Sequence, residues 1–126
     1  MHIADIRKEL KRIAQYEVLL FGSSLNGTHR EGSDIDIAIL ARTEDVKKIK
    51  QTKLDVIQLV PSQYDVQVFE SLPTTVKASI LHSYDVIFGD PLEIGEYLYR
   101  YWKEWQDYSF RLELPTVDEM RKAVNI

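Results

Sequence analysis

The sequence predicts an α/β (α+β) fold in a single domain, with a mixed sheet of about four strands flanked by helices. Helical and strand patterns alternate along the chain, as expected for such a fold. A length of 126 residues allows one hydrophobic core but not two ordinary domains. With 44% hydrophobic and 29% charged residues, the composition is that of a folded protein. We expect the domain to span residues 1–114, followed by a tail or short helix over 115–126.

The first third of the chain is expected to form one helix and two strands. Residues 2–15 carry apolar side chains at helical spacing, namely Ile3, Ile6, Leu10 and Ile13. Residues 17–21 (EVLLF) form a short apolar run, and residues 34–40 (DIDIAIL) alternate strictly in polarity. Both segments are therefore predicted strands, and the apolar stripe of the helix would cover the sheet that they form.

The rest of the chain alternates helices and strands up to a long final helix. The pattern predicts helices over 44–58 and 73–82, and strands over 64–69 (YDVQVF) and 84–88 (YDVIF). A final helix is expected over 91–113, because Asp90 is a good N-cap residue and Pro91 suits the first helical position. This order of elements supports one mixed sheet.

A glycine–serine pair and three aspartates form the pattern that carries chemistry. Gly22 ends a strand, so backbone N–H groups of the following turn, together with Ser23, would approach phosphate oxygens. Asp34 and Asp36 share one face of a strand because side chains alternate with period two. Asp65 adds a third carboxylate if its strand lies beside theirs. Three carboxylates holding two divalent cations meet the requirement of in-line displacement at a phosphorus atom.

Further residues around this pattern are candidates for supporting roles. Arg30 and His29 lie in the turn between the glycine–serine pair and the aspartates, within reach of a phosphate group. Ser33 directly precedes the first aspartate, and we include it with Arg30 among the expected nucleotide-binding residues. Asp55 competes with Asp65 for the third carboxylate position. Asp55 falls within a helical pattern, however, and a carboxylate at that position is explained by an exposed helix face.

At these residues the sequence resembles the DNA polymerase β-like nucleotidyltransferase superfamily, whose signature is Gly-Ser followed at this distance by Asp-x-Asp. Residues 21–40 (FGSSLNGTHREGSDIDIAIL) are similar in particular to the minimal nucleotidyltransferases of prokaryotes. Residues 64–91 (YDVQVFESLPTTVKASILHSYDVIFGDP) resemble the third-carboxylate strand, helix and final strand of that family. The resemblance covers roughly residues 15–113.

The resemblance implies an enzyme that transfers AMP from ATP to a hydroxyl group with the help of two Mg²⁺ ions. Asp34 and Asp36 would be metal ligands, and Asp65 would be a third ligand and the base toward the acceptor hydroxyl. Gly22 and Ser23 would bind the triphosphate. Many proteins of this kind are antitoxins of HEPN-type toxins, which they silence by binding and in some cases by adenylylating a tyrosine. We therefore expect a HEPN-type partner.

Two other interpretations stay open. The chain would act as a catalytically idle antitoxin if it neutralised a HEPN partner by contact alone. Alternatively, it would transfer the nucleotide to another small-molecule or RNA hydroxyl, although the chain has little room for a substrate domain. One departure from the family pattern bears on activity, since Asn26 stands in the turn where members often carry Arg.

The predicted helix over 91–113 is unusually rich in aromatic residues. On a helical wheel an arc of roughly 140° holds Tyr97, Leu98, Tyr101, Trp102, Trp105, Tyr108 and Leu112. Tyr99 and Phe110 lie outside this arc. One small sheet cannot cover all these side chains, so the helix forms either a wide core stripe or a surface for a partner or a second copy of the chain.

Composition limits the remaining classes of function. Because the chain has no cysteine, any metal must be held by carboxylates or histidines. The net charge of −4 argues against a large nucleic-acid footprint. A solvated helix face, or an attraction for ATP or nucleic acid, would explain the basic cluster of Lys47, Lys48, Lys50 and Lys53. The sequence shows no signal peptide and no membrane span, so we expect a cytoplasmic protein without a membrane partner.

Overall fold

The computed structural model describes residues 2–22 and 34–113, with side chains up to residue 109. Its helices and strands follow in the order α1 (Ile3–Glu9), β1 (Glu17–Leu20), β2 (Ile35–Leu40), α2 (Val46–Ile57), β3 (Tyr64–Val68), α3 (Thr74–His82), β4 (Asp85–Phe88) and α4 (Pro91–Glu113). Short 3₁₀ helices, η1 (Lys11–Ile13) and η3 (Phe69–Ser71), follow α1 and β3. The predicted α+β class with its final long helix is confirmed.

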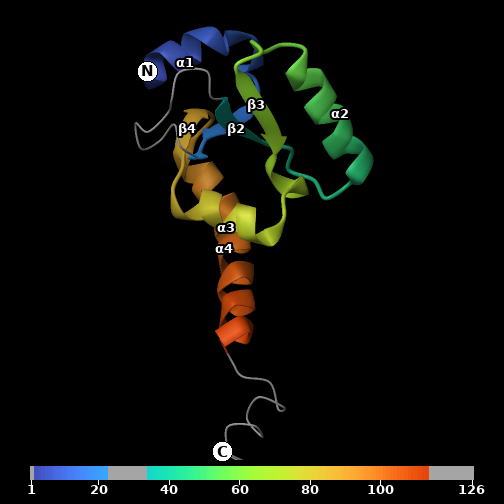
Figure 1. Ribbon diagram of the computed structural model, residues 1–126, viewed down its shortest axis with the longest axis vertical. Helices are drawn as coiled ribbons and strands as arrows, with labels where there is room; N and C mark the ends of the chain where they lie inside the picture. The colour runs from blue at the N-terminus through green and yellow to red at the C-terminus, as the bar shows by residue number, and fades with distance from the viewer. Residues whose placement is uncertain (1, 23–33, 114–126) are drawn as a thin grey trace, which may run out of the picture.

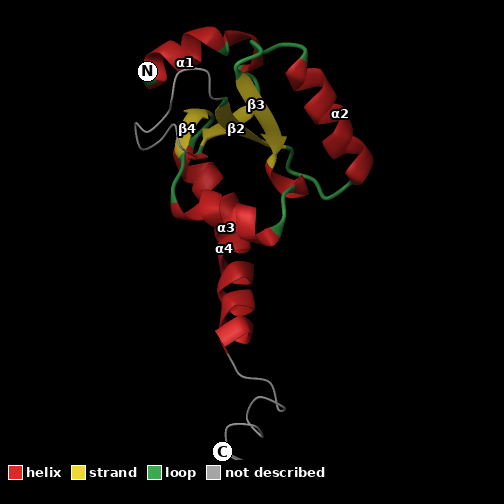
Figure 2. Cartoon of the chain, viewed as in Figure 1, coloured by secondary structure: helices red, strands yellow, loops and turns green. Residues whose placement is uncertain are grey.

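The four strands form one mixed sheet in the order β3-β2-β1-β4. β1 lies in the middle and pairs antiparallel with both β2 and β4, whereas β2 and β3 are parallel. Figure 2 shows the strands in yellow between the helices. The parallel pair is joined through α2, as parallel strands require a crossover connection.

Helices cover both faces of the sheet, so the domain has three layers (Figure 1). One core cluster joins α1 and α2 to side chains of one sheet face, including Ile37 and Ile39. The other joins α3 and α4 to the opposite face, including Leu19 and Ala38. Because side chains alternate along β2, Asp36 falls on the face that carries Ala38 and is covered by α3 and α4.

The N-terminal helix is shorter than the pattern predicts. α1 ends at Glu9, and a 3₁₀ turn replaces the expected helix up to residue 15. The N–H group of Leu10 still donates to the Ile6 carbonyl, but that of Ile13 donates to the Leu10 carbonyl, three residues back. This tighter winding keeps Leu10 and Ile13 fully buried while it leads the chain into β1.

A buried carboxylate fixes the end of the sheet opposite the aspartate pattern. Glu70 is 5% exposed and accepts from the backbone N–H groups of Ala41 (2.9 Å) and Arg42 (2.8 Å). It also accepts from the Tyr97 hydroxyl (2.5 Å) of α4, whose pKa is raised by burial and by this carboxylate. Arg42, with a φ of 59°, makes a bidentate ion pair with Glu17. Glu70 therefore joins β2 to α4 and satisfies three donors.

The final helix begins where the sequence predicts. Asp90 caps α4 by accepting from the Leu92 N–H group (3.2 Å). The helix is 23 residues long, and its C-terminal half projects beyond the sheet (Figure 1). Of the helices in the described part of the chain, none combines the length and the apolar character needed to cross a lipid bilayer.

Candidate active site

The candidate site lies at one end of the sheet, where β1 ends and β2 and β3 begin. β1 ends at Leu20 and is followed by Phe21 and Gly22, while β2 and β3 begin at this same end of the sheet. The Phe21 N–H group donates to the Asp36 carbonyl (3.2 Å), which continues the β1–β2 pairing past the end of β1. The topology therefore brings Gly22 beside Asp36, as the sequence predicts.

Gly22 lies in direct contact with the Asp36 carboxylate. Its φ of 79° is in the left-handed region that favours glycine. A Cβ atom at position 22 would lie 2.4 Å from Asp36 Oδ2 and 3.3 Å from its Cγ. No side chain fits there without displacing the carboxylate. Glycine is thus required both by the backbone conformation and by the close approach of Asp36.

The second and third aspartates of the pattern are neighbours across the parallel strand pair. Asp36 of β2 and Asp65 of β3 are register partners, so their side chains lie on the same face of the sheet. Their backbones are about one strand spacing, roughly 4.8 Å, apart. Both side chains are half-buried. Gln67, two residues further on the same face of β3, donates to Asp65 Oδ1 (3.2 Å). The prediction that β3 lies beside the Asp34–Asp36 strand is confirmed.

Asp34 stands just before β2 and is exposed. It precedes Asp36 by two residues, the spacing that would place both carboxylates on one face if the strand geometry extended to position 34. Within residues 2–22 and 34–113, no three His, Cys, Asp or Glu side chains are grouped closely enough to hold a metal ion. The backbone thus brings the three aspartates to one end of the sheet. That they bind a cation together stays a prediction.

The start of β3 is anchored from the opposite face of the sheet. Tyr64, which precedes Asp65, is buried and donates its hydroxyl hydrogen to a Glu9 carboxylate oxygen of α1. Burial, followed by this bond, raises the pKa of Tyr64, so the phenol stays protonated as a donor. The Ile35 N–H group donates to the Gln63 carbonyl (2.9 Å) and fixes the β2–β3 register. These bonds set the position of Asp65 relative to Asp36.

Several predicted site residues lie outside the described residues. They are Ser23, Arg30 and Ser33 of the expected nucleotide-binding set, together with Asn26 and His29. Asp55, the alternative third carboxylate, lies on the exposed face of α2 and accepts from Gln51 (2.8 Å), one turn away. The structure therefore favours Asp65 over Asp55 for the third position.

One residue beside the site was not singled out by the sequence. Lys53 of α2 is half-buried and, together with Asp65, lines a cavity of about 250 Å³ between α2 and β3. In the sequence it is one of four lysines of a basic helix, and no local signal separates it from the others. Only the packing of α2 against β3 brings it near Asp65.

A strand-end glycine against one aspartate, with a second aspartate in register on the next strand, offers hard oxygen donors of the kind that Mg²⁺ prefers. Residues 3–87, which extend from α1 into β4, match the family described as the nucleotidyltransferase domain. The chain belongs to this family and is an enzyme of the nucleotidyltransferase class.

Individual relatives narrow the comparison. A protein of Methanocaldococcus jannaschii, named as a putative protein adenylyltransferase, is 31% identical over 109 residues, which cover 86% of this chain and 84% of that protein. A solved toxin–antitoxin structure with AMP-PNP superimposes with a TM-score of 0.64 at 22% identity, covering 88% of this chain and 92% of that one.

A second solved structure contains a tri-AMPylated Shewanella oneidensis HEPN toxin in complex with an MNT antitoxin. It superimposes with a TM-score of 0.56 at 20% identity and covers 86% of this chain and 87% of that one. At these identities the two solved structures show that the fold is shared.

Proposed function

We propose that this chain transfers AMP from ATP to a hydroxyl group of a protein, and that the protein is a HEPN-type toxin that the chain neutralises. The observation that carries the proposal is the placement of Asp36 against Gly22 and in register with Asp65. The name of the M. jannaschii relative and the tri-AMPylated toxin beside the S. oneidensis antitoxin support the choice of a protein acceptor.

Each site residue has a chemical role in this proposal. Asp34, Asp36 and Asp65 would hold two Mg²⁺ ions, which when bound supply the positive charge that offsets the triphosphate and the mutual repulsion of the carboxylates. The turn after β1 would present backbone N–H groups to the triphosphate, since Gly22 lets the chain pass close to Asp36. Asp65 would accept the proton of the attacking hydroxyl group.

The reaction balances without a covalent enzyme intermediate. A bond forms between the acceptor oxygen and the α-phosphorus of ATP, while the bond from that phosphorus to the bridging oxygen breaks. Pyrophosphate leaves with the electron pair, and the acceptor proton passes to Asp65. A tyrosine hydroxyl of the partner is the acceptor that we propose, and ATP is the donor.

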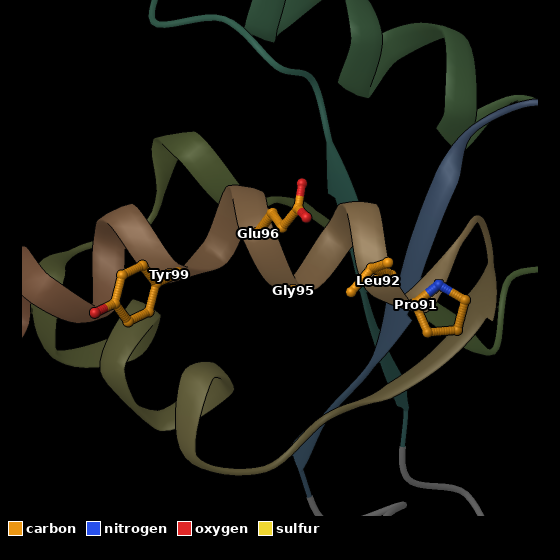
Figure 3. A pocket seen from close by; sticks show the side chains of 5 residues that line it. All are labelled: Pro91, Leu92, Gly95, Glu96 and Tyr99. Atoms are coloured by element: carbon orange, nitrogen blue, oxygen red, sulfur yellow. The ribbon is translucent and has the colours of Figure 1, made fainter.

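The surface that we propose for the HEPN partner lies along α4. An apolar hollow of about 390 Å³ is lined by Pro91, Leu92, Gly95, Glu96 and Tyr99 (Figure 3). Leu92 is 70% and Tyr99 59% exposed, and Gly95 between them has open space where a side chain would stand. The hollow continues through Gly95 and Tyr99 into a smaller one of about 180 Å³ that also contacts Trp102.

Part of the expected aromatic arc of α4 is buried and part is exposed, in agreement with the expectation that one small sheet cannot cover all of it. Leu98 and Tyr101 are buried and Trp102 and Trp105 half-buried, as a core stripe requires, but Tyr108 is 42% exposed. The reason is that α4 runs beyond the sheet, so the stripe loses its cover toward the C-terminal end. The position of Tyr99 outside the stripe is confirmed, whereas the Phe110 side chain is not among those described.

Replacing Leu92 and Tyr99 together by serine is expected to weaken binding of the HEPN-type partner by about 2 kcal/mol or more, because exposed apolar and aromatic anchors contribute most to such interfaces. Calorimetry on the purified pair measures this change. Val46 and Leu54 are exposed on α2 (76% and 47%), so their replacement by serine is a matched control that should leave the affinity unchanged. Equal losses in both variants would contradict this docking surface, and loss of self-association alone would assign the hollow to a second copy.

The experiment that tests the proposed activity compares AMP transfer to the partner by the wild type and by Asp36→Asn. We expect the wild type to add the mass of AMP to a partner tyrosine and the variant to lose this activity by about 10³-fold or more. Binding of the partner should persist in the variant, since Asp36 lies on β2 and not on α4. A wild type that binds and silences the partner without any transfer would instead establish the idle antitoxin.

A further inference from the structure

Gln67 of β3 lies on the same face of the sheet as Asp65, two residues further along the strand. The Gln67 side-chain amide donates to Asp65 Oδ1 at 3.2 Å. An ionised carboxylate can only accept hydrogen bonds, so the nitrogen of the amide and not its oxygen faces Asp65. Among the residues that the structure describes, no other group donates to this carboxylate. Gln67 is therefore the neighbour that fixes how the Asp65 side chain is oriented.

The backbone around Asp65 is already fixed by other bonds. The β2–β3 ladder sets the register of Asp65 with Asp36, and Tyr64, which precedes Asp65, is bonded to α1. These bonds leave the side chain of Asp65 free to rotate about its Cα–Cβ and Cβ–Cγ bonds, and rotation about the second is only weakly restricted in aspartate. The hydrogen bond from Gln67 restricts both rotations, because it ties one carboxylate oxygen to a residue of the same strand.

The surroundings of Gln67 in the sheet suit this role. Its register partner on β2 is Ala38, which is fully buried. Because the neighbouring side chain on β2 is only a methyl group, a long side chain at position 67 has room to lie along β3 toward Asp65. Gln67 is itself half-buried on the face that α3 and α4 cover. A hydrogen bond to a carboxylate is stronger in such a site than in open water.

The two neighbouring carboxylates are thus held in different ways. Asp36 lies against Gly22, where a Cβ atom would come within 2.4 Å of Asp36 Oδ2. Asp65 is held through Oδ1, by a residue that lies further along β3 and away from the start of the strand. No donor in the described part of the chain reaches Asp65 Oδ2. Oδ2 is therefore the oxygen that stays available for a cation and for a proton.

We propose that Gln67 is a positioning residue for the transfer reaction, because by holding Oδ1 of Asp65 it presents Oδ2 to the hydroxyl group that attacks ATP. This inference rests on the proposed role of Asp65 as the base and specifies what orients that base. Gln67 would act through Asp65 and not by contact with the substrate. A reacting group must be held within about 0.5 Å of its productive position. A base that rotates freely therefore lowers the rate of the chemical step and not the affinity for the substrates.

Gln67→Met removes the amide and keeps the length of the side chain. We expect kcat for AMP transfer to the partner to fall by about tenfold or more, while the KM values for ATP and for the partner change by less than about twofold. Gln51→Met is the matched control, since it removes an amide–aspartate bond of the same kind (Gln51 to Asp55, 2.8 Å) on the exposed face of α2. The control should leave all three constants unchanged, and thermal unfolding of both variants checks that the fold is retained.

A double-mutant cycle separates positioning of Asp65 from a general structural role. In an Asp65→Asn background there is no carboxylate to orient, so adding Gln67→Met should lower single-turnover transfer by less than about twofold further. An equal loss in both backgrounds would overturn the proposal, because Gln67 would then support the fold and not the base. A raised KM for the partner with an unchanged kcat would also overturn it, because Gln67 would then contact the acceptor directly.

A second measurement needs neither metal nor activity. In the metal-free protein, the side-chain carboxyl ¹³C resonance of Asp65 can be assigned by its disappearance in Asp65→Asn. We expect this resonance to move in Gln67→Met, which removes the donor to Oδ1, and to stay in place in Gln51→Met. A resonance that is the same in the wild type and in Gln67→Met would show that the amide does not hold the carboxylate, and would overturn the proposal.

Failure of this inference is distinct from failure of the proposed function. If the Asp65 resonance responds to Gln67→Met but the wild type transfers no AMP to any hydroxyl, including water, the orienting bond stands and the proposed function is wrong. If the wild type adenylylates its partner and Gln67→Met does so with an unchanged kcat, the function stands and the positioning role is wrong.

Discussion

Gly22→Ala is expected to reduce nucleotidyl transfer by about 100-fold or more. The alanine Cβ would lie 2.4 Å from Asp36 Oδ2, so the carboxylate must move away from its place beside Asp65. A residue other than glycine at a φ of 79° also costs about 1–2 kcal/mol of stability. Transfer of labelled AMP and thermal unfolding of the same preparation measure both effects.

Gly95→Ala is the matched control for this substitution. Gly95 lies within α4, where a Cβ atom would meet nothing within 4 Å. Alanine there should leave transfer unchanged and stabilise the domain by about 0.5–1 kcal/mol, because glycine is unfavourable inside a helix. If Gly22→Ala retained full activity, the contact between Gly22 and the Asp36 carboxylate would have no part in the reaction.

Asp65→Asn is expected to reduce transfer by about 10³-fold or more while ATP binding changes by only a few-fold. The amide cannot accept the proton of the attacking hydroxyl, whereas the triphosphate would be held mainly by the turn after β1 and by Mg²⁺ bound to Asp34 and Asp36. The substituted side chain would also keep an oxygen that accepts from the Gln67 amide, so the start of β3 should stay in place. Single-turnover transfer and calorimetry with ATP separate the two effects.

Asp55→Asn makes the same chemical change on the exposed face of α2. It should leave both transfer and ATP binding unaltered, apart from the local bond to Gln51. An equal loss of ATP binding and transfer in Asp65→Asn would assign Asp65 to the triphosphate and not to the acceptor. A loss of transfer in Asp55→Asn would return that residue to the site.

Much of the fold could be predicted because its signals are local. The alternation in residues 34–40 and the Asp90 cap of α4 depend on neighbours in sequence, and the structure places β2 and α4 within a residue of the expected bounds. The early end of α1 could not be read in this way. The helical spacing continues through Leu10 and Ile13, and it is the path into β1 that tightens the chain into a 3₁₀ turn.

The site could be predicted where it depends on the pairing of consecutive strands. That Asp36 and Asp65 come close required that β2 and β3 be neighbours, as consecutive strands usually are, whereas their register is set by bonds such as that from Ile35 to the Gln63 carbonyl. The buried Glu70 and the cavity beside Lys53 could not be predicted. Their roles depend on side chains and backbone groups distant in sequence, such as Ala41 and Tyr97 for Glu70 and Asp65 for Lys53.

The central claim is that the site formed by Gly22, Asp36 and Asp65 catalyses transfer of AMP and not of phosphate. The most direct test supplies ATP labelled at either the α- or the γ-phosphorus, with magnesium and the purified HEPN-type partner. The account predicts that the α-label alone becomes attached to a partner tyrosine and that Asp36→Asn or chelation of magnesium removes this transfer. Attachment of the γ-label, or α-label transfer that persists undiminished in Asp36→Asn, would contradict it.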